Sequence, residues 1–318
     1  MTGTFKIAAS SDDLLLSVLA TEPPDLDPSD AAGVIQMIHG VSGHKERFFP
    51  MMQYLSSCGY ICVVHDNRGH GQSVKDPGDL GYMYSAKARG LVEDVLSVNK
   101  WIRDTYPGKR VYLYGHSMGS LIARCYLKDH DGTIDGLILS SSPPYNSLAP
   151  LGKAMIGVLA LLYGGKERGW RRVIPLFNEL ANRFYARKLP SGSSPCAWIC
   201  SDSAVVEEFE RDPLCGYPLT LNGYYAFLDL MEDCYSIKGY KVSSPHLPIW
   251  FMAGEDDPCL GGRRKWEAAL KKLRQAGYLD VMGKMYPGMR HELYNEIGKE
   301  GVWSDLGDRI GSWTGTLR

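Results

Sequence analysis

Short runs of apolar and β-branched residues alternate along the chain with longer segments in which apolar residues recur every three or four positions. The short runs predict strands at 34–38, 60–64, 111–114, 137–139 and 249–252. The longer segments predict helices at 48–57, 86–106, 118–130 and 263–275. Two further runs, 5–8 and 14–18, flank Ser-Asp-Asp and predict a hairpin at the sheet edge. This alternation is typical of an α/β fold with a mostly parallel sheet and helices on both faces.

The alternation stops between Pro143 and Pro245. This stretch is far longer than the roughly 10–12 residues that a crossover between parallel strands requires. It contains four helix-like pieces, separated by breaks rich in glycine and proline, at 153–163, 173–185, 204–210 and 221–232. We therefore expect an inserted helical cap, residues 143–242, over a core made of residues 1–142 and 243–318.

A candidate nucleophile lies between a predicted strand and a predicted helix. Gly115-His116-Ser117-Met118-Gly119 fits the pattern G-x-S-x-G, directly after the strand at 111–114 and at the start of the helix at 118–130. Glycines at both ends of the motif permit a sharp strand-to-helix turn, which holds the serine hydroxyl above the carboxyl ends of the strands. Ser117 is therefore the candidate catalytic serine.

A serine hydroxyl needs a base that takes its proton, and the base needs a carboxylate that orients it. The strand at 249–252 leads into Glu255, Asp256 and Asp257, three acids that compete for the orienting role. The strand-like run 281–286 leads into His291, and no other histidine follows the last strand. The order serine, acid, histidine is the one expected with this type of nucleophile turn.

An acyl-transfer intermediate also needs hydrogen-bond donors for its oxyanion. Backbone N–H groups at a helix start and in a neighbouring loop usually supply them. We predict the N–H of Met118 as the first donor. The N–H of Val41, in the loop 39–44 after the strand at 34–38, is the second.

Together these motifs resemble the serine α/β-hydrolase superfamily, and more narrowly its monoglyceride lipase and lysophospholipase branch. The matching segments are His39-Gly40, the turn Asp66-Asn67-Arg68-Gly69-His70-Gly71-Gln72-Ser73, the serine motif, Asp257-Pro258, and the segment from Tyr286 to Glu292. They lie within 33–142 and 245–296, outside the cap. The resemblance implies the α/β-hydrolase fold and ester hydrolysis through an acyl-serine. It also favours Asp257, because the family's acid precedes proline.

The chain departs from this family pattern at the oxyanion loop and after the serine motif. Ser42 and Gly43 stand where the lipases usually have glycine and glutamate, and Ser120 replaces a common third glycine. The resemblance therefore implies ester hydrolysis more strongly than monoacylglycerol or lysophospholipid specificity. A short-chain carboxylesterase is one alternative.

Two other readings keep the fold but change the function. A proline iminopeptidase type of aminopeptidase needs cap acids that bind a free N-terminus, and the acids Glu207, Glu208, Glu210 and Asp212 are available. A silent binding module would use the cavity as a receptor, but such a protein is expected to have a damaged triad. The epoxide hydrolases and dehalogenases of this fold use aspartate as nucleophile, whereas position 117 is serine.

The composition and net charge of the chain exclude some classes of binding partner. The chain has 35 basic and 36 acidic residues among 318, so no global positive field favours nucleic acid. Eight cysteines are scattered, and Cys196 and Cys200 lack a second ligand pair, so we expect no metal and no cofactor. The expected partner is a small, lipid-like ester. No oligomeric state follows from the sequence.

The first residues lack the basic and apolar regions of a secretory signal, which predicts a cytoplasmic enzyme. The longest apolar run, 154–163, is too short to span a bilayer, which takes about 20 residues. It is followed by Lys166, Arg168 and the segment 170–172, rich in arginine and tryptophan. The run therefore predicts either cap core or a peripheral contact with a membrane interface.

Overall fold

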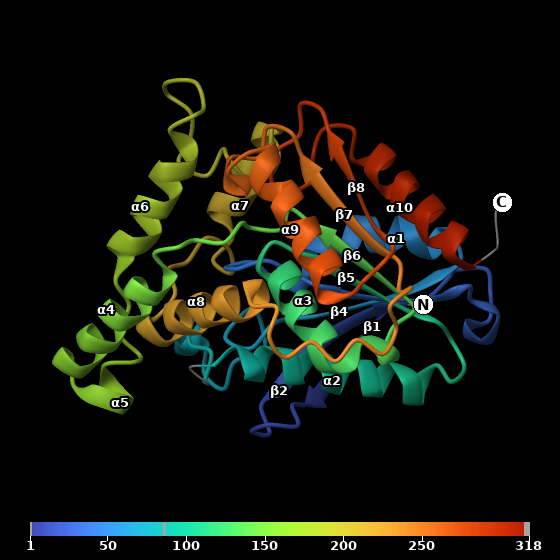
Figure 1. The fold of residues 1–318 in the computed structure, drawn as a ribbon, viewed down its shortest axis with the longest axis horizontal. Helices are drawn as coiled ribbons and strands as arrows, with labels where there is room; N and C mark the ends of the chain where they lie inside the picture. The colour runs from blue at the N-terminus through green and yellow to red at the C-terminus, as the bar shows by residue number, and fades with distance from the viewer. Residues whose placement is uncertain (1, 85–86, 315–318) are drawn as a thin grey trace.

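The computed structural model describes residues 2–84 and 87–314. Within these residues the strands form one eight-stranded sheet in the order β1-β2-β4-β3-β5-β6-β7-β8 (Figure 1). The strands are β1 (Thr2–Ala8), β2 (Leu15–Thr21), β3 (Gly33–Ile38), β4 (Tyr60–His65), β5 (Val111–His116), β6 (Gly136–Ser140), β7 (Ile249–Gly254) and β8 (Val281–Tyr286). Strands β3 to β8 run parallel, whereas β1 and β2 form an antiparallel hairpin at one edge. The predicted α/β class and edge hairpin are confirmed.

Helices cover both faces of the sheet and bury alternate residues of each strand. On one face, α2 (Ala88–Thr105), α3 (Met118–His130) and α9 (Arg263–Ala276) pack over residues such as Val34 and Ile38. On the other face, α1 (Phe49–Ser57) and α10 (Lys299–Thr314) pack over Ile35 and Met37. All six residues of β3 are therefore buried.

The helix α10 has no counterpart among the predicted elements. Gly301, Gly307 and Gly311 lower its intrinsic helix propensity and obscure its periodicity. Burial of Trp303 and Leu306 against the sheet stabilises the helix instead. Of the other helices, α1, α2, α3 and α9 agree with the predicted segments within a few residues. The predicted start of α2 at residue 86 lies outside the described residues.

The inserted helices lie between two strands that are neighbours in the sheet, β6 and β7. They are α4 (Ala149–Leu162), α5 (Gly165–Arg168), α6 (Pro175–Ala186), α7 (Ser203–Arg211) and α8 (Leu221–Tyr235). Four of them correspond to the predicted pieces, and α5 is an additional short turn. Helix α8 packs against the core helix α3, whereas α4, α5 and α6 form the outer edge of the molecule in Figure 1.

The apolar run in α4 is divided between core and surface. Ile156 and Ala160 are buried against α8, as a cap core requires. On the other side of the helix, large apolar side chains are exposed, namely Leu151, Met155, Val158, Leu161 and Leu162. The apolar run is therefore buried on one side of the helix and exposed on the other. In the described part of the chain, no helix is long and apolar enough to cross a membrane.

Candidate active site

Ser117 occupies a strained turn at the carboxyl end of β5. Its φ of 53° and ψ of −118° lie outside the regions that non-glycine residues favour. A Cβ at Gly115 would collide with the backbone of Gly119, and a Cβ at Gly119 would collide with the carbonyl of Ile38. Both glycines of the motif are therefore required by close backbone packing, which holds Ser117 in the wall of a cavity.

His291 and Asp257 form a buried pair. The distance from Nδ1 of His291 to Oδ2 of Asp257 is 2.8 Å, and the Asp257 carboxylate is completely buried. The other oxygen, Oδ1, accepts a 2.8 Å hydrogen bond from the N–H of Cys259. Glu255 and Asp256 are exposed, and Glu255 pairs with Arg263 at 2.7 Å. Of the three competing acids, the structure brings Asp257 to the histidine.

The carboxyl ends of four neighbouring strands hold these groups together. Ser117 follows β5, Asp257 follows β7 and His291 follows β8. Between them, Ser140 ends β6, and its carbonyl accepts a 2.9 Å hydrogen bond from the N–H of Ser117. The hydroxyl of Ser141 donates to the carbonyl of His291 at 2.6 Å, which fixes the backbone of the base. No sequence pattern pointed to Ser141.

A second histidine, His116, lies beside the base without competing for its role. The two ring centroids are 4.9 Å apart. Burial, aided by the nearby His291 and Arg47, holds the pKa of His116 well below its usual range. His116 is therefore neutral and adds no charge next to the pair of His291 and Asp257.

The loop after β3 passes directly over the serine. A Cβ on Gly40 would lie 3.2 Å from the Cβ of Ser117, so the backbone approaches the nucleophile closely. Nε2 of His39 accepts a 2.9 Å hydrogen bond from the N–H of Asn67, and burial holds the pKa of His39 well below its usual range. Neutral His39 thereby braces the loop that carries Val41 along the cavity wall.

Met118 begins α3, and its N–H belongs to the first turn, where helical N–H groups lack partners within the helix. This N–H lies next to Ser117 in the chain. The roles of Val41 and Met118 as oxyanion donors stay predictions, which the close approach of the loop to the serine supports.

The turn that follows β4 braces the loop from behind. Asp66 accepts hydrogen bonds from the backbone N–H and Nζ of Lys45, both at 2.8 Å. Arg68 pairs with Asp94 on α2 at 2.6 Å and with Asp12 at 3.0 Å. Arg68 therefore ties the turn to α2 and the edge hairpin and does not reach the triad, which agrees with a structural role.

The oxyanion loop is also joined to the inserted helices. The N–H of Gly216 donates to the carbonyl of Ser42, and the hydroxyl of Ser42 donates to the carbonyl of Tyr217, both at 2.8 Å. Ser42 has a φ of 49°. At this departure from the family pattern, Ser42 therefore forms hydrogen bonds to the insertion.

His44 adds an ionic contact to the same junction. Its Nδ1 lies 2.7 Å from Glu46 and its Nε2 lies 2.8 Å from Asp212 in the insertion. Burial disfavours the charged ring, but hydrogen bonds to Cys215, Glu46 and Asp212 outweigh this effect and raise the pKa of His44 to about 10. We call the contacts of Ser42 and His44 with residues 212–217 the loop latch.

Among the described residues, two groups of side chains offer donor atoms for a metal ion. One is His44, Asp212 and Cys215, and the other is Asp257, Cys259 and His291. A metal-bound histidine must be neutral, whereas both nitrogens of His44 face carboxylates that stabilise its charged form. In the second group, His291 and Asp257 are already paired with each other at 2.8 Å. The side chains of both groups are therefore arranged as ion pairs and do not form a suitable metal site.

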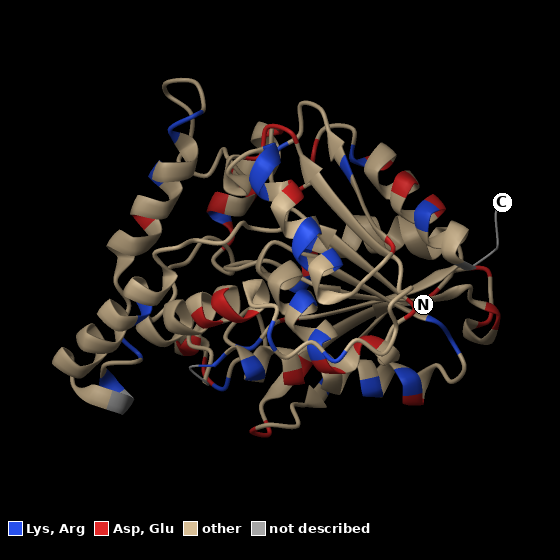
Figure 2. Cartoon of the chain, viewed as in Figure 1, with Lys and Arg blue, Asp and Glu red and all other residues tan. Residues whose placement is uncertain are grey.

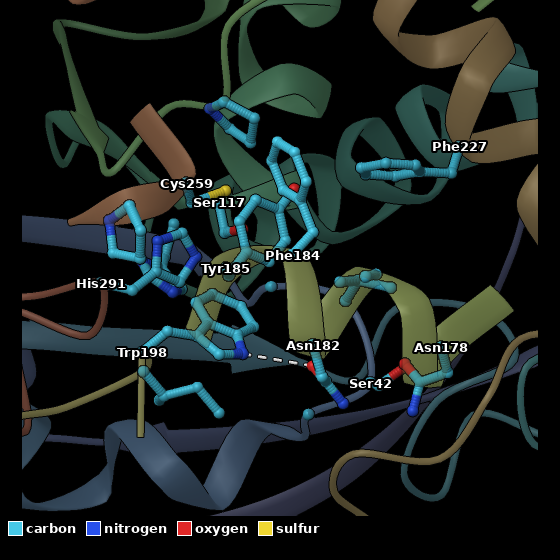
Figure 3. Close-up of a pocket in the computed structure, with 18 of the residues that line it drawn as sticks. Ser42, Ser117, Asn178, Asn182, Phe184, Tyr185, Trp198, Phe227, Cys259 and His291 are labelled. Carbon is cyan, nitrogen blue, oxygen red and sulfur yellow. Dashed lines mark hydrogen bonds between the residues drawn. The ribbon is translucent and has the colours of Figure 1, made fainter. Parts of the chain in front are cut away.

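A cavity of about 660 Å³ opens above Ser117 and His291 (Figure 3). The insertion supplies much of its wall through Asn178, Asn182, Phe184, Tyr185, Trp198, Leu219, Tyr224, Phe227, Leu228 and Met231. These residues were not predicted, because no motif marks them. In Figure 3, Phe184 and Tyr185 lie between His291 and Phe227, so the cavity continues from the base toward α8.

Trp198 from the insertion contacts the base directly. Its ring centroid lies 5.0 Å from that of His291, and its Nε1 donates to Asn182 at 3.2 Å (Figure 3). Arg290, next to the base, donates to the carbonyls of Ala197 and Cys200 at 2.7 and 3.0 Å. The tryptophan is therefore fixed over the imidazole by both side-chain and backbone contacts.

A family model described as serine aminopeptidase, S33, matches residues 29–298. The chain belongs to this family of α/β-hydrolases. The hydrolase is 24% identical over 285 residues to the monoacylglycerol lipase of Mycolicibacterium smegmatis, covering 89% of this chain and 88% of that protein. It is 32% identical over 113 residues to a lysophosphatidylserine lipase of Danio rerio, covering 34% of this chain and 27% of that protein.

The fold of this α/β-hydrolase also matches a solved structure, that of a highly thermostable carboxyl esterase from Bacillus coagulans in complex with glycerol. The TM-score is 0.87 at 24% identity, over 98% of this chain and 99% of that chain. The predicted α/β-hydrolase fold is thereby confirmed, as is the resemblance to the superfamily and its monoglyceride lipase branch.

Proposed function

We propose that this hydrolase cleaves carboxylic esters of monoacyl lipids, monoacylglycerols or lysophospholipids, through an acyl-serine intermediate. The observation that carries the proposal is the buried 2.8 Å contact between His291 and Asp257, because His291 lines the same cavity as Ser117. A hydroxyl, an imidazole and a carboxylate at one sheet edge are the groups that two-step acyl transfer requires.

In the proposed mechanism, His291 takes the proton of Ser117 as the serine oxygen attacks the ester carbonyl. Asp257 orients the imidazole and stabilises the imidazolium that forms. The N–H groups of Val41 and Met118 bind the oxyanion. The imidazolium then gives its proton to the departing alcohol. Water, activated by His291, releases the carboxylic acid from the acyl-serine.

The shape of the cavity favours a long acyl chain over a small ester. Its wall includes apolar side chains of α8 and the preceding segment, among them Leu219, Phe227, Leu228 and Met231, and Phe227 lies away from His291 in Figure 3. A volume of about 660 Å³ exceeds what a short ester fills. A short-chain carboxylesterase would leave this apolar surface unused, which makes it the weaker alternative.

The aminopeptidase alternative lacks the acid that would bind a free amino terminus. Glu207, Glu208 and Glu210 are exposed on α7 and do not line the cavity. Asp212 is held by His44 at 2.8 Å. Glu292 does line the cavity, but it is paired with Arg47. The description of the family model is therefore a weaker guide to the substrate than the side chains of this cavity.

We further propose that residues 143–242 act as a cap domain that docks peripherally on lipid surfaces. Leu161 and Leu162 are 73% and 76% exposed on α4, and Leu180 is 54% exposed on α6. Apolar helix faces of this kind insert into the interface of a bilayer. The insertion also forms the cavity wall, so docking would bring the cavity close to its substrate.

Initial rates on a panel of esters test the proposed activity, with Ser117→Ala as the blank. The panel contains a monoacylglycerol, a lysophospholipid, a short aryl ester and an aminoacyl anilide. Turnover of the two lipids, abolished in the variant, supports the proposal. Turnover of the short ester or the anilide alone would contradict the lipid assignment.

A further inference from the structure

The charged residues at the mouth of the cavity are unbalanced. Arg187 and Lys188 follow α6, and Lys265 lies in the first turn of α9; all three are exposed and line the cavity. Figure 2 shows basic positions beyond the end of α6 and at the start of α9. The three cations thus come from two segments far apart in the sequence and line the solvent-exposed part of the same cavity.

No carboxylate neutralises these cations in the described part of the chain. None of the three lies within 4.0 Å of a carboxylate, whereas the neighbouring Arg263 pairs with Glu255 at 2.7 Å. The one carboxylate of the cavity wall, Glu292, is paired with the buried Arg47. The mouth therefore carries uncompensated positive charge.

Two of the cations are also held in place. The stem of Lys265 folds over the turn at Gly261, where a Cβ would lie 2.9 Å from Cδ of the lysine. The guanidinium of Arg187 lies 4.0 Å from the centroid of the Phe184 ring, which itself lines the cavity. These contacts keep the two charges near the opening and reduce the entropy lost when they bind an anion.

We infer that this opening is an anion site that binds the phosphate group of a monoacyl phospholipid, with Arg187, Lys188 and Lys265 as its ligands. The apolar far end near Phe227 takes the acyl chain, which places the ester beside Ser117 and the head group at the mouth. The inference rests on the proposed function and selects, from its two substrate classes, the one that carries a phosphate. Positive charge at an opening also raises the rate of encounter with an anionic substrate.

The chemical step is unchanged by this assignment. The bond between the acyl carbon and the glycerol oxygen breaks, and the proton held by His291 passes to that oxygen. Water supplies the oxygen of the fatty acid. The phosphate ester is not cleaved, so the products are a fatty acid and a glycerophosphate or its diester.

Hydrolysis of two lauroyl substrates tests the site. We compare monolauroylglycerol with lauroyl lysophosphatidic acid in the wild type, in the triple variant Arg187→Gln, Lys188→Gln, Lys265→Gln, and in a matched control. The control is Lys100→Gln, Lys238→Gln, Lys271→Gln, which removes the same charge from exposed positions outside the cavity wall.

We expect the triple variant to lower kcat/KM for the phosphate-bearing ester by roughly tenfold or more and to leave the neutral ester within about twofold. The control should change neither by more than about twofold. Raising the ionic strength should remove the preference in the wild type. Equal losses on both substrates, or no loss in the triple variant, would overturn the inference.

Binding of uncleavable ethers separates this inference from the proposed function. Dodecylglycerol ether and its phosphate are titrated calorimetrically into the wild type and the triple variant. Tighter binding of the phosphate by roughly tenfold, lost in the triple variant, establishes the anion site even in a protein that hydrolyses neither lauroyl ester. Equal affinity for the two ethers would overturn the inference whatever the enzyme hydrolyses.

Discussion

Asp257 and Asp256 are adjacent acids in opposite surroundings. Asp257 is buried and its carboxylate contacts the imidazole of His291, whereas Asp256 is exposed. Substituting Asp257→Asn removes the charge that stabilises the imidazolium but keeps an oxygen for the N–H of Cys259. We expect a fall in kcat of roughly 10⁴-fold, as with other triad acids.

The neighbouring substitution Asp256→Asn is the matched control and should leave kcat within about twofold. Initial rates of ester hydrolysis measure both variants, and thermal unfolding checks that each is folded. Similar losses in the two variants would show that Asp257 has no special role.

Trp198 is a positioning residue in this account. It packs on the ring of His291 and is fixed by Asn182. Replacing Trp198 with alanine frees the imidazole and admits water, so we expect kcat/KM to fall by roughly tenfold. Trp198→Phe keeps an aromatic face and should restore most of the rate.

The rate of inactivation by a small fluorophosphonate distinguishes two roles of Trp198, positioning His291 and contacting the substrate. This probe does not fill the cavity, so its rate does not depend on contacts between Trp198 and the substrate. The rate should fall in the alanine variant and recover in the phenylalanine variant. An unchanged inactivation rate in Trp198→Ala would show that the tryptophan contacts the substrate and does not position His291.

For single residues, the sequence predicted those that follow the ends of strands better than those that line the cavity. Ser117 and His291 follow recognisable strands, so their meeting at one sheet edge was predictable. Trp198 lies in a segment with no periodicity, and its contact with the base depends on how the insertion folds back. Glu255, Asp256 and Asp257 are adjacent in the chain and differ in where their side chains point. The spacing of residues in the sequence does not reveal that difference.

The loop latch connects the oxyanion loop to the insertion through a charged histidine. The pKa of His44 is raised to about 10, above its ordinary value near 6.5. The protonated ring therefore stabilises the fold fully below pH of about 6.5, and this stabilisation is lost as the pH rises toward about 10.

We expect His44→Gln to lower the free energy of unfolding most near pH 6 and progressively less toward pH 9, with a slope of at most about 1.4 kcal/mol per pH unit. Denaturant titrations at several pH values measure this difference. The exposed His246→Gln is the control and should show no such trend. A difference that stays constant or grows with pH would contradict the charged latch.

At the scale of elements, regular periodicity decided what was predictable. The helices α2 and α3 carry clear apolar stripes and were predicted. Helix α10 contains three glycines, which lower its helix propensity. Burial of Trp303 against the sheet stabilises the helix, and this contact joins residues that are distant in the sequence. The division of α4 into a buried and an exposed side also depends on where α8 packs.

At the scale of the whole molecule, α4 and α6 lie along one edge (Figure 1), and Leu161, Leu162 and Leu180 on these helices are exposed. Replacing Leu161 and Leu162 with serine should weaken binding to phosphatidylcholine vesicles by roughly tenfold or more, because each exposed leucine loses its transfer into lipid. Neutral vesicles exclude a contribution from the basic mouth. Cosedimentation measures the bound fraction.

The control for this surface is Leu279→Ser, which changes a leucine that is 67% exposed but lies outside the insertion. Hydrolysis of a dispersed short ester should be unchanged in both variants. Unchanged vesicle binding in the double leucine variant would contradict peripheral docking through α4.

Covalent labelling of Ser117 is the direct test of whether His291 and Asp257 activate its hydroxyl. We would treat the folded protein with a fluorophosphonate and locate the adduct by peptide mass spectrometry. We expect one adduct, on Ser117, that forms far more slowly in His291→Ala and Asp257→Asn and at the wild-type rate in Asp256→Asn. An adduct on another residue, or labelling of Ser117 that does not depend on His291, would contradict this expectation.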